Sequence, residues 1–295
     1  MSKHDKENDV GTTGHEWDGI EELNNPLPRW WLWILYLTIV WAVGYTIAYP
    51  AWPMVKGATT GLLGYSTRAE VAEDIARVDA ANADILARLS SVDLTAISDD
   101  AELEGFAINA GASIFAANCS QCHGRGAAGV QAGGYPNLLD DDWLWGGEIE
   151  EIAYTVTHGI RNEQSFDSRY SQMSAFGVDG ILTDDEIDSV VQHVLAISGQ
   201  DYDADLASAG AELFLDNCAS CHGDNGEGML DIGAPNLSDA IWLYGGDEDT
   251  IRTSIYNARF GVMPAWSEEY RSAGGLSTAE INAVATYVHQ LGGAQ

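Results

Sequence analysis

The stretches "NCSQCHG" at residues 118–124 and "NCASCHG" at residues 217–223 contain all four cysteines of the chain. Each stretch places two cysteines three positions apart and follows the second cysteine directly with a histidine. The second stretch begins 99 positions after the first, so the cysteines are used twice in the same frame. The pattern therefore predicts one kind of site that occurs twice.

Three chemistries use Cys-x-x-Cys pairs, and only one of them uses the histidine as well. Paired motifs of a zinc site usually lie about 15 to 20 residues apart, and a thioredoxin-like pair belongs to a βαβ unit. Cys-x-x-Cys-His is the attachment motif of c-type haem, in which the thiols add to the two vinyl groups and the imidazole binds the iron. We therefore predict two covalently bound haem c groups. Their attachment cysteines and iron-binding histidines are Cys119, Cys122, His123, Cys218, Cys221 and His222.

The motifs lie at the centre of a longer internal repeat. Residues before and after the cysteines match at the same offset of 99. The matching pairs include Gly111 with Gly210, Phe115 with Phe214, Pro136 with Pro235, and Trp143 with Trp242. Self-similarity at a fixed offset indicates homologous units, so we predict two tandem domains at 103–199 and 203–293.

Hydrophobic periodicity predicts that each domain opens with a helix that runs into its cysteine pair and closes with another helix. Capping boxes at 183–186 (Thr-Asp-Asp-Glu) and 277–280 (Ser-Thr-Ala-Glu) precede the two closing helices. Gly-, Pro- and Asn-rich loops lie between, and no stretch alternates as a strand. The fold class predicted is all-α, and domains of about 90 residues are small enough to use a cofactor as part of the core.

An uncharged run of twenty residues from Trp30 to Tyr49 precedes the repeat. At about 1.5 Å per residue it spans about 30 Å, the thickness of the hydrocarbon core of a bilayer. A cleaved signal peptide would need a short basic leader and a shorter apolar core, whereas this leader is long and acidic. We predict a retained transmembrane helix at 30–50, after a tail at 1–29.

A linker at 51–102 follows the transmembrane helix and carries an amphipathic helix from Thr67 to about Leu89. Basic residues near the ends of the span do not decide its orientation. Haem attachment to Cys-x-x-Cys-His takes place on the outer side of the bacterial inner membrane. This predicts periplasmic domains and linker, and a cytoplasmic N-terminus.

Each haem iron needs a distal ligand, and methionine is usual where a high reduction potential is wanted. Met173 and Met263 lie late in the two repeats, before the closing helices, and are the predicted ligands. The sequence leaves open whether each methionine binds the iron of its own repeat or that of the other. Met229 has no methionine counterpart in the first repeat and is read as core packing.

Other residues of the repeats have a structural and a functional interpretation. His158 is replaced by Asn257 in the second repeat, so a hydrogen-bonding or haem-edge role is favoured over ligation. Pro136 and Pro235 form a turn, or offer a backbone carbonyl to the ring N–H of the iron-binding histidine. The paired tryptophans, Trp143 and Trp242, either pack in the core or contact the haem.

The formal net charge of −32 excludes a general nucleic-acid binder, because a phosphate backbone would be repelled. Such a surface is compatible with solvation alone or with a basic protein partner.

The combination of "NPLPRWWLWILYLTIVW" at 25–41 with two haem domains that each carry "PNL" and "WLxGG" resembles subunit III of the cbb3-type cytochrome c oxidases. This subunit is a dihaem, membrane-anchored cytochrome c, and the resemblance covers nearly the whole chain from about Trp17. It implies two class I-like cytochrome c folds on a transmembrane helix, docked to a haem–copper catalytic subunit and a monohaem cytochrome c subunit. One departure is that Ser174 follows Met173, where Met-Pro is common, as in Met263-Pro264.

The function that the resemblance implies is electron relay from a soluble periplasmic cytochrome c towards the oxygen-reducing centre. No residue indicates a catalytic acid or base, so the chain is not expected to be an enzyme by itself. Two alternatives remain at this point. A free-standing dihaem carrier would purify without a haem–copper subunit, and a dihaem peroxidase would turn over peroxide.

Overall fold

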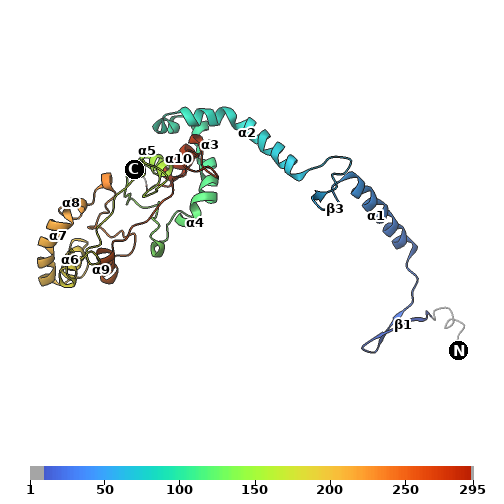
Figure 1. Cartoon of the computed structure of the whole chain (residues 1–295), viewed down its shortest axis with the longest axis horizontal. Helices are drawn as coiled ribbons and strands as arrows, with labels where there is room; N and C mark the ends of the chain where they lie inside the picture. The colour runs from blue at the N-terminus through green and yellow to red at the C-terminus, as the bar shows by residue number, and fades with distance from the viewer. Residues whose placement is uncertain (1–9, 294–295) are drawn as a thin grey trace. The chain divides into compact units, whose positions relative to one another are not determined.

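The computed structural model describes residues 10–293, in two compact units, Met1–Ala81 and Asn82–Gln295 (Figure 1). Each unit is described by itself. The N-terminal unit contains α1, Arg29–Ala48, and two short antiparallel hairpins. The hairpin strands are β1 Thr12–Trp17 with β2 Ile20–Leu23, and β3 Pro53–Met54 with β4 Gly57–Ala58.

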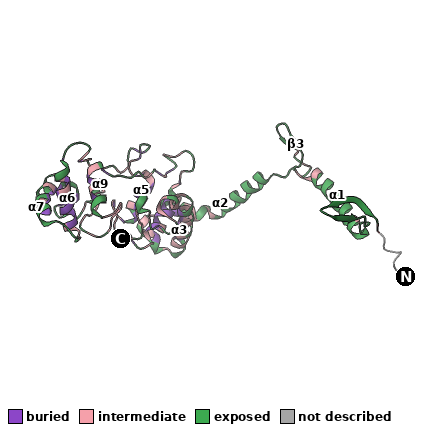
Figure 2. Ribbon diagram, turned by 90° about the horizontal axis from the view of Figure 1, so that it is seen from below, coloured by how far each residue is buried: buried purple, intermediate pink, exposed green. Residues whose placement is uncertain are grey.

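Helix α1 confirms the predicted apolar helix and contains no buried residue (Figure 2). The two threonine hydroxyls in the helix are satisfied internally, since Thr38 donates to the Leu35 carbonyl and Thr46 to the Val43 carbonyl. Such internal pairing is what a helix needs where no water can reach it.

Helix α2, Thr67–Ser91, confirms the amphipathic helix that its apolar stripe predicted. Only the end of the stripe is buried. Leu89 is fully buried in a cluster with Ile97 and Leu103, whereas Val71 and Ile75 are more than half exposed. The C-terminal end of α2 is therefore part of the hydrophobic core of the second unit.

The closing helix of each repeat packs against the opening helix of the other repeat. The opening helices are α3, Ala101–Ile114, and α7, Ala204–Asn217; the closing helices are α6, Asp184–Ile197, and α10, Thr278–His289. Helix α3 packs against α10, and α6 packs against α7 (Figure 1). The cause lies in the short link 198–203, which makes α6 and α7 antiparallel neighbours and leaves α10 to cover α3.

The paired glycines of the repeat lie where these helices cross. A Cβ atom on Gly111 of α3 would collide with the Ala283 carbonyl of α10 and lie 2.7 Å from the Tyr287 Cβ. A Cβ atom on Gly210 of α7 would collide in the same way with the Ser189 carbonyl of α6. The missing side chain thus lets each helix pair approach to backbone contact.

Two hydrophobic cores follow from this exchange. The first lobe consists of α3, α10 and α5, Ile149–His158, which bury Phe115 and Val284. The second lobe consists of α6, α7 and α9, Glu248–Asn257, which bury Val190 and Phe214. Neither lobe is one continuous segment, because each combines helices from both repeats.

Local signals in the sequence place the closing helices well. Thr183 and Glu186 form the predicted capping box of α6, and Ser277 and Glu280 form that of α10. The lobes also contain several short helices, some of which carry residues of the two motifs. They are η1 Leu94–Asp99, η2 Phe115–Cys119, α4 Ser120–His123, η3 Gln131–Gly133, α8 Ala219–His222 and η4 Leu230–Ile232.

Candidate haem-binding sites

Each Cys-x-x-Cys-His motif begins where a long helix ends. In the first lobe the chain passes from α3 through the π-helical turn η2 into α4, and in the second lobe from α7 into α8. The paired asparagines support the same bend, because Asn118 donates to the Ile114 carbonyl and Asn217 to the Leu213 carbonyl. Cys122 and His123 lie in α4, and Cys221 and His222 lie in α8, whereas Cys119 and Cys218 directly precede these short helices.

The two histidines have the same orientation. Nδ1 of His123 lies 3.2 Å from the Pro136 carbonyl oxygen, and Nδ1 of His222 lies 3.0 Å from that of Pro235. Of the two interpretations of these prolines, the contacts support the one in which their carbonyls accept from the histidine rings. A carbonyl only accepts, so the proton sits on Nδ1 and the lone pair of Nε2 is free to bind a metal.

Burial lowers the pKa of both histidines, against the smaller opposite effect of the carbonyl acceptors. The neutral imidazole is therefore favoured, which is the form that ligates iron. Burial also raises the pKa of Cys119 and Cys218 to about 11, with a smaller contribution from the neighbouring cysteine. A thioredoxin-like pair needs a lowered thiol pKa, so these pairs do not fit that chemistry.

The structure groups each motif with the methionine of the other repeat. Met173 lines a cavity of about 350 Å³ together with Cys218 and His222. Met263 packs on the first hydrophobic core together with Cys119. The sequence could not decide between own and crossed pairing, and the exchanged helices bring the crossed partners together.

The donor sets suit the predicted cofactor. The cavity of the second lobe has the size of a ligand site and is lined mainly by apolar side chains around two thiols, one imidazole and one thioether. Histidine and methionine are the axial pair of cytochromes c, and two thiols beside the histidine are the attachment pair. The residues present therefore fit haem c.

Met229 and His158 lie elsewhere. Met229 is exposed, so the interpretation of it as core packing is wrong. Its backbone pairs with Ala234 in the loop after the second motif, as Val130 pairs with Tyr135 after the first. The Nδ1 atom of His158 lies 3.2 Å from the Ser165 hydroxyl. Neither residue lines the cavity beside the second motif.

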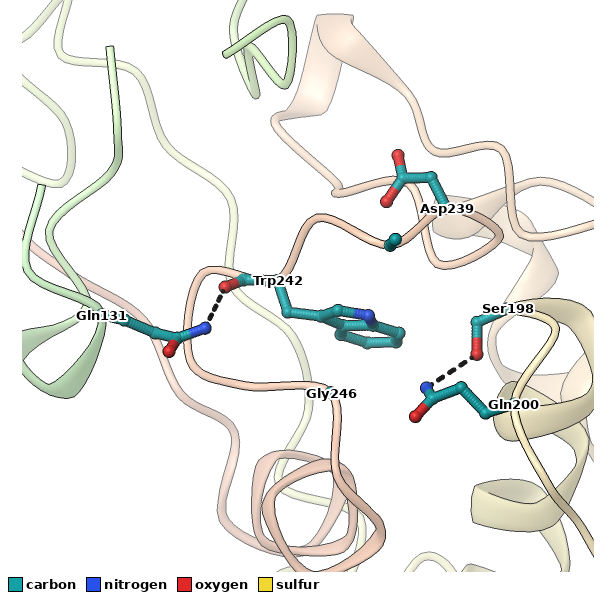
Figure 3. Close-up of a pocket in the computed structure, with 7 residues that line it drawn as sticks. Gln131, Ser198, Gln200, Asp239, Trp242 and Gly246 are labelled. Atoms are coloured by element: carbon teal, nitrogen blue, oxygen red, sulfur yellow. Dashed lines mark hydrogen bonds between the residues drawn. The ribbon is translucent and has the colours of Figure 1, made fainter. Parts of the chain in front are cut away.

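The paired tryptophans both lie beside the haem sites but differ in surroundings. Trp143 packs on the first core and its indole N–H donates to the Asp140 carbonyl. Trp242 lines the cavity of the second motif and also a surface pocket that contains Asp239 and Gln200 (Figure 3). Its carbonyl accepts from Gln131 of the first repeat. Trp242 therefore lies between this cavity and the surface pocket.

Contacts between the lobes include a reciprocal pair that the sequence reasoning missed. Tyr244 packs directly on Gly134, and Trp145 packs directly on Gly233. Both glycines have a left-handed backbone, φ 67° and 61°, in the loops that lead to the two histidine-bonded prolines. The offset of 99 relates both members of each pair and was the available signal, since 145 matches 244 and 134 matches 233.

Two charged residues at the cavity of the second lobe were also missed. Asp142 and Arg161 both line this cavity. Burial, together with the nearby charge of Asp239, raises the pKa of Asp142 to about 6. Neither residue has a counterpart of the same type at the offset of 99, so the repeat gave no indication of them.

Comparison with known families gives a consistent assignment along the chain. Residues 9–56 match the N-terminal domain of the cbb3 cytochrome oxidase protein FixP. Residues 106–194 match cbb3-type cytochrome c oxidase subunit III, and residues 207–292 match cytochrome c.

Similar proteins cover almost the whole chain. Cbb3-type cytochrome c oxidase subunit CcoP of Cereibacter sphaeroides is 59% identical, over 96% of this chain and 95% of that protein. CcoP of Rhodobacter capsulatus is 54% identical over 97% of each chain. FixP of Bradyrhizobium is 49% identical over 99% of this chain and 98% of the relative. The chain therefore belongs to the CcoP/FixP family, the membrane-bound, electron-transferring dihaem cytochrome c subunit III of cbb3-type oxidases.

Proposed function

We propose that the chain relays electrons from a soluble periplasmic cytochrome c, through two covalently bound haem c groups, to the haem–copper subunit of its oxidase. A monohaem cytochrome c subunit of the complex would be its other neighbour. The observation that carries the proposal is that each Cys-x-x-Cys-His motif shares a buried apolar core with one methionine, Met263 in the first lobe and Met173 in the second.

The roles of the first site follow from its contacts. Cys119 and Cys122 would hold the haem by thioether bonds, and His123 would bind the iron through Nε2 while Pro136 fixes the ring. Met263 would close the sixth position. A haem bound in this way supplies a one-electron iron couple, and a thioether ligand raises its reduction potential.

The second site has the same design. Cys218 and Cys221 would hold the haem, His222 would bind its iron while Pro235 fixes the ring, and Met173 would be the other iron ligand. With both axial positions taken by the protein, neither iron would offer a free site to oxygen or peroxide. This supports relay in preference to peroxidase chemistry.

The membrane arrangement belongs to the same proposal. Helix α1 would cross the bacterial inner membrane once, with residues 1–29 in the cytoplasm. The linker at 51–102 and both lobes would lie in the periplasm, where haem is attached and where a soluble cytochrome c would reach them. An exposed apolar helix of twenty residues supports the single crossing.

The test uses the oxidase complex purified from its own membranes. The double variant Cys119→Ala, Cys122→Ala should lower oxygen consumption with reduced cytochrome c at least tenfold. A small reductant that reaches the haem–copper subunit directly should still support turnover. Undiminished turnover with cytochrome c, or purification of the chain without a haem–copper subunit, would contradict the proposal.

A further inference from the structure

The loops that carry the two methionines are joined by one side chain, that of Arg161. Its Nε donates to the Gly261 carbonyl at 2.6 Å, and its Nη1 donates to the Ser171 carbonyl at 2.7 Å. Ser171 lies two residues before Met173, and Gly261 lies two residues before Met263. The guanidinium therefore bonds to corresponding positions of the two loops.

Backbone hydrogen bonds also hold the segment around Arg161 in place, one pair of them to Met263. Its neighbour Ile160 pairs with Met263, with N–H to carbonyl distances of 2.9 and 3.0 Å in the two directions. The Arg161 N–H donates to the Arg169 carbonyl at 2.8 Å. Arg161 itself has φ 52°, a left-handed conformation that a residue other than glycine rarely adopts. A conformation of this kind persists only where surrounding contacts fix it.

The charge of Arg161 has no acidic partner in the part of the chain that the structure describes. The side chain is partly buried and lines the cavity beside Met173, and it also lies over the Phe260 ring. Among residues 10–293 no carboxylate forms an ion pair with it, although the chain has 45 acidic residues. Partial burial of this cation costs free energy, because two carbonyls replace only part of its hydration. Full exposure to water would avoid that cost.

We propose that Arg161 is a positioning residue shared by both haem sites, because its guanidinium holds the loops of Met173 and Met263 where each methionine binds iron. This inference rests on the proposed assignment of the two methionines as ligands. It makes the two sites dependent on one side chain, so a change at Arg161 alters both together.

Arginine is suited to this role for a geometric reason. Its planar fork presents N–H groups in fixed directions and bonds two acceptors at once. A lysine keeps the positive charge but presents it as a single point, so it cannot hold two carbonyls from separate loops in the same geometry. Arg161→Lys therefore separates the effect of the fork from the effect of the charge.

The experiment compares wild type, Arg161→Gln and Arg161→Lys in the haem-loaded full chain. Imidazole is titrated into the oxidised protein while the near-infrared band of sulfur–iron charge transfer is recorded, and both reduction potentials are measured. In Arg161→Gln imidazole should displace both methionines at a concentration at least tenfold lower than in wild type, and both potentials should fall. Arg161→Lys should show the same displacement with a smaller fall in potential.

Arg252→Gln is the matched control. Arg252 does not line this cavity, and its guanidinium donates to Asp184 and Asp188 of α6. Its imidazole titration should match wild type. The proposal is overturned if Arg161→Gln changes one site or neither, or if Arg161→Lys titrates like wild type, since charge alone would then be the cause.

Haem content and circular dichroism show whether each variant is folded. If Arg161→Gln does not load both haems, the comparison of Arg161→Lys with wild type decides the test. Met173→Ala and Met263→Ala separate this proposal from the ligand assignment. If neither methionine variant alters the near-infrared band, the assignment itself fails. If both alter it while the Arg161 variants do not, only the role of Arg161 fails.

Discussion

Replacing Gly111 by alanine should destabilise the first lobe, because this glycine lets α3 touch the backbone of α10. The added Cβ would collide with the Ala283 carbonyl, which belongs to a helix backbone and cannot rotate away. Overpacking of this kind costs about 1–3 kcal/mol, and separation of two helices lies at the upper end. The alanine regains about 0.5–1 kcal/mol of helix propensity. We therefore expect a net loss of about 2 kcal/mol.

Gly105→Ala is the control on the same helix. A Cβ atom on Gly105 meets no atom within 4 Å, so only the gain in propensity of about 0.5–1 kcal/mol remains. For a unit of this size 1 kcal/mol corresponds to about 2–4 °C in the midpoint of thermal unfolding. Gly111→Ala should lower the midpoint by about 4–8 °C, and Gly105→Ala should raise it by a few degrees.

The assay is thermal unfolding of the detergent-purified, haem-loaded chain, followed by far-ultraviolet circular dichroism and by the sulfur–iron band. Gly111→Ala should weaken the signal of the Met263 site before that of the Met173 site, because α10 closes the first lobe. Equal stability of Gly111→Ala and Gly105→Ala, or weakening of the Met173 site alone, would refute the packing of α3 on α10.

Further outcomes follow from the anchor, the cofactor and the buried acid. The denatured protein should exceed the mass of its polypeptide by two haems, whereas a mass matching the bare chain would contradict covalent attachment. Removal of residues 1–55 behind a cleavable export signal should give a soluble protein that still carries both haems; a native protein whose mature N-terminus lies near residue 50 would instead show that α1 is a signal peptide. Asp142, whose pKa is raised to about 6, contributes stability below about pH 4 that is lost as pH rises through 6. Asp142→Asn should therefore be the more stable protein at pH 8, by roughly 1–2 kcal/mol after allowance for its partial exposure, with the difference vanishing near pH 4 in chemical unfolding curves. Identical curves for both proteins across this range would show that Asp142 titrates normally.

The sequence predicts the elements of this fold better than it predicts their pairing. The uncharged run of twenty residues predicts α1, and the two capping boxes predict where α6 and α10 begin. These signals are local, so they can be recognised in the sequence. The choice of partner for each closing helix is not local. The repeats are homologous, so α6 and α10 present similar faces to α3 and α7, and the short link 198–203 decides the pairing.

The haem sites show the same division. The motif and its offset identify the cysteines and histidines directly, and the position of the prolines predicts their carbonyl contacts. The contacts of Arg161 could not be predicted from the sequence, because its acceptors, Ser171 and Gly261, come from loops far apart in the chain. The hairpin β1–β2 was also not predicted, since all its residues are exposed and no alternation of buried and exposed side chains marks it.

Crossed axial ligation is tested most directly in a protein that keeps only one haem. In a background with Cys119→Ala and Cys122→Ala, the remaining haem is attached to the second motif, and the oxidised protein should retain its near-infrared sulfur–iron band. Adding Met173→Ala should abolish that band, whereas adding Met263→Ala should leave it intact. A band that survives Met173→Ala and disappears in Met263→Ala would contradict the crossed arrangement.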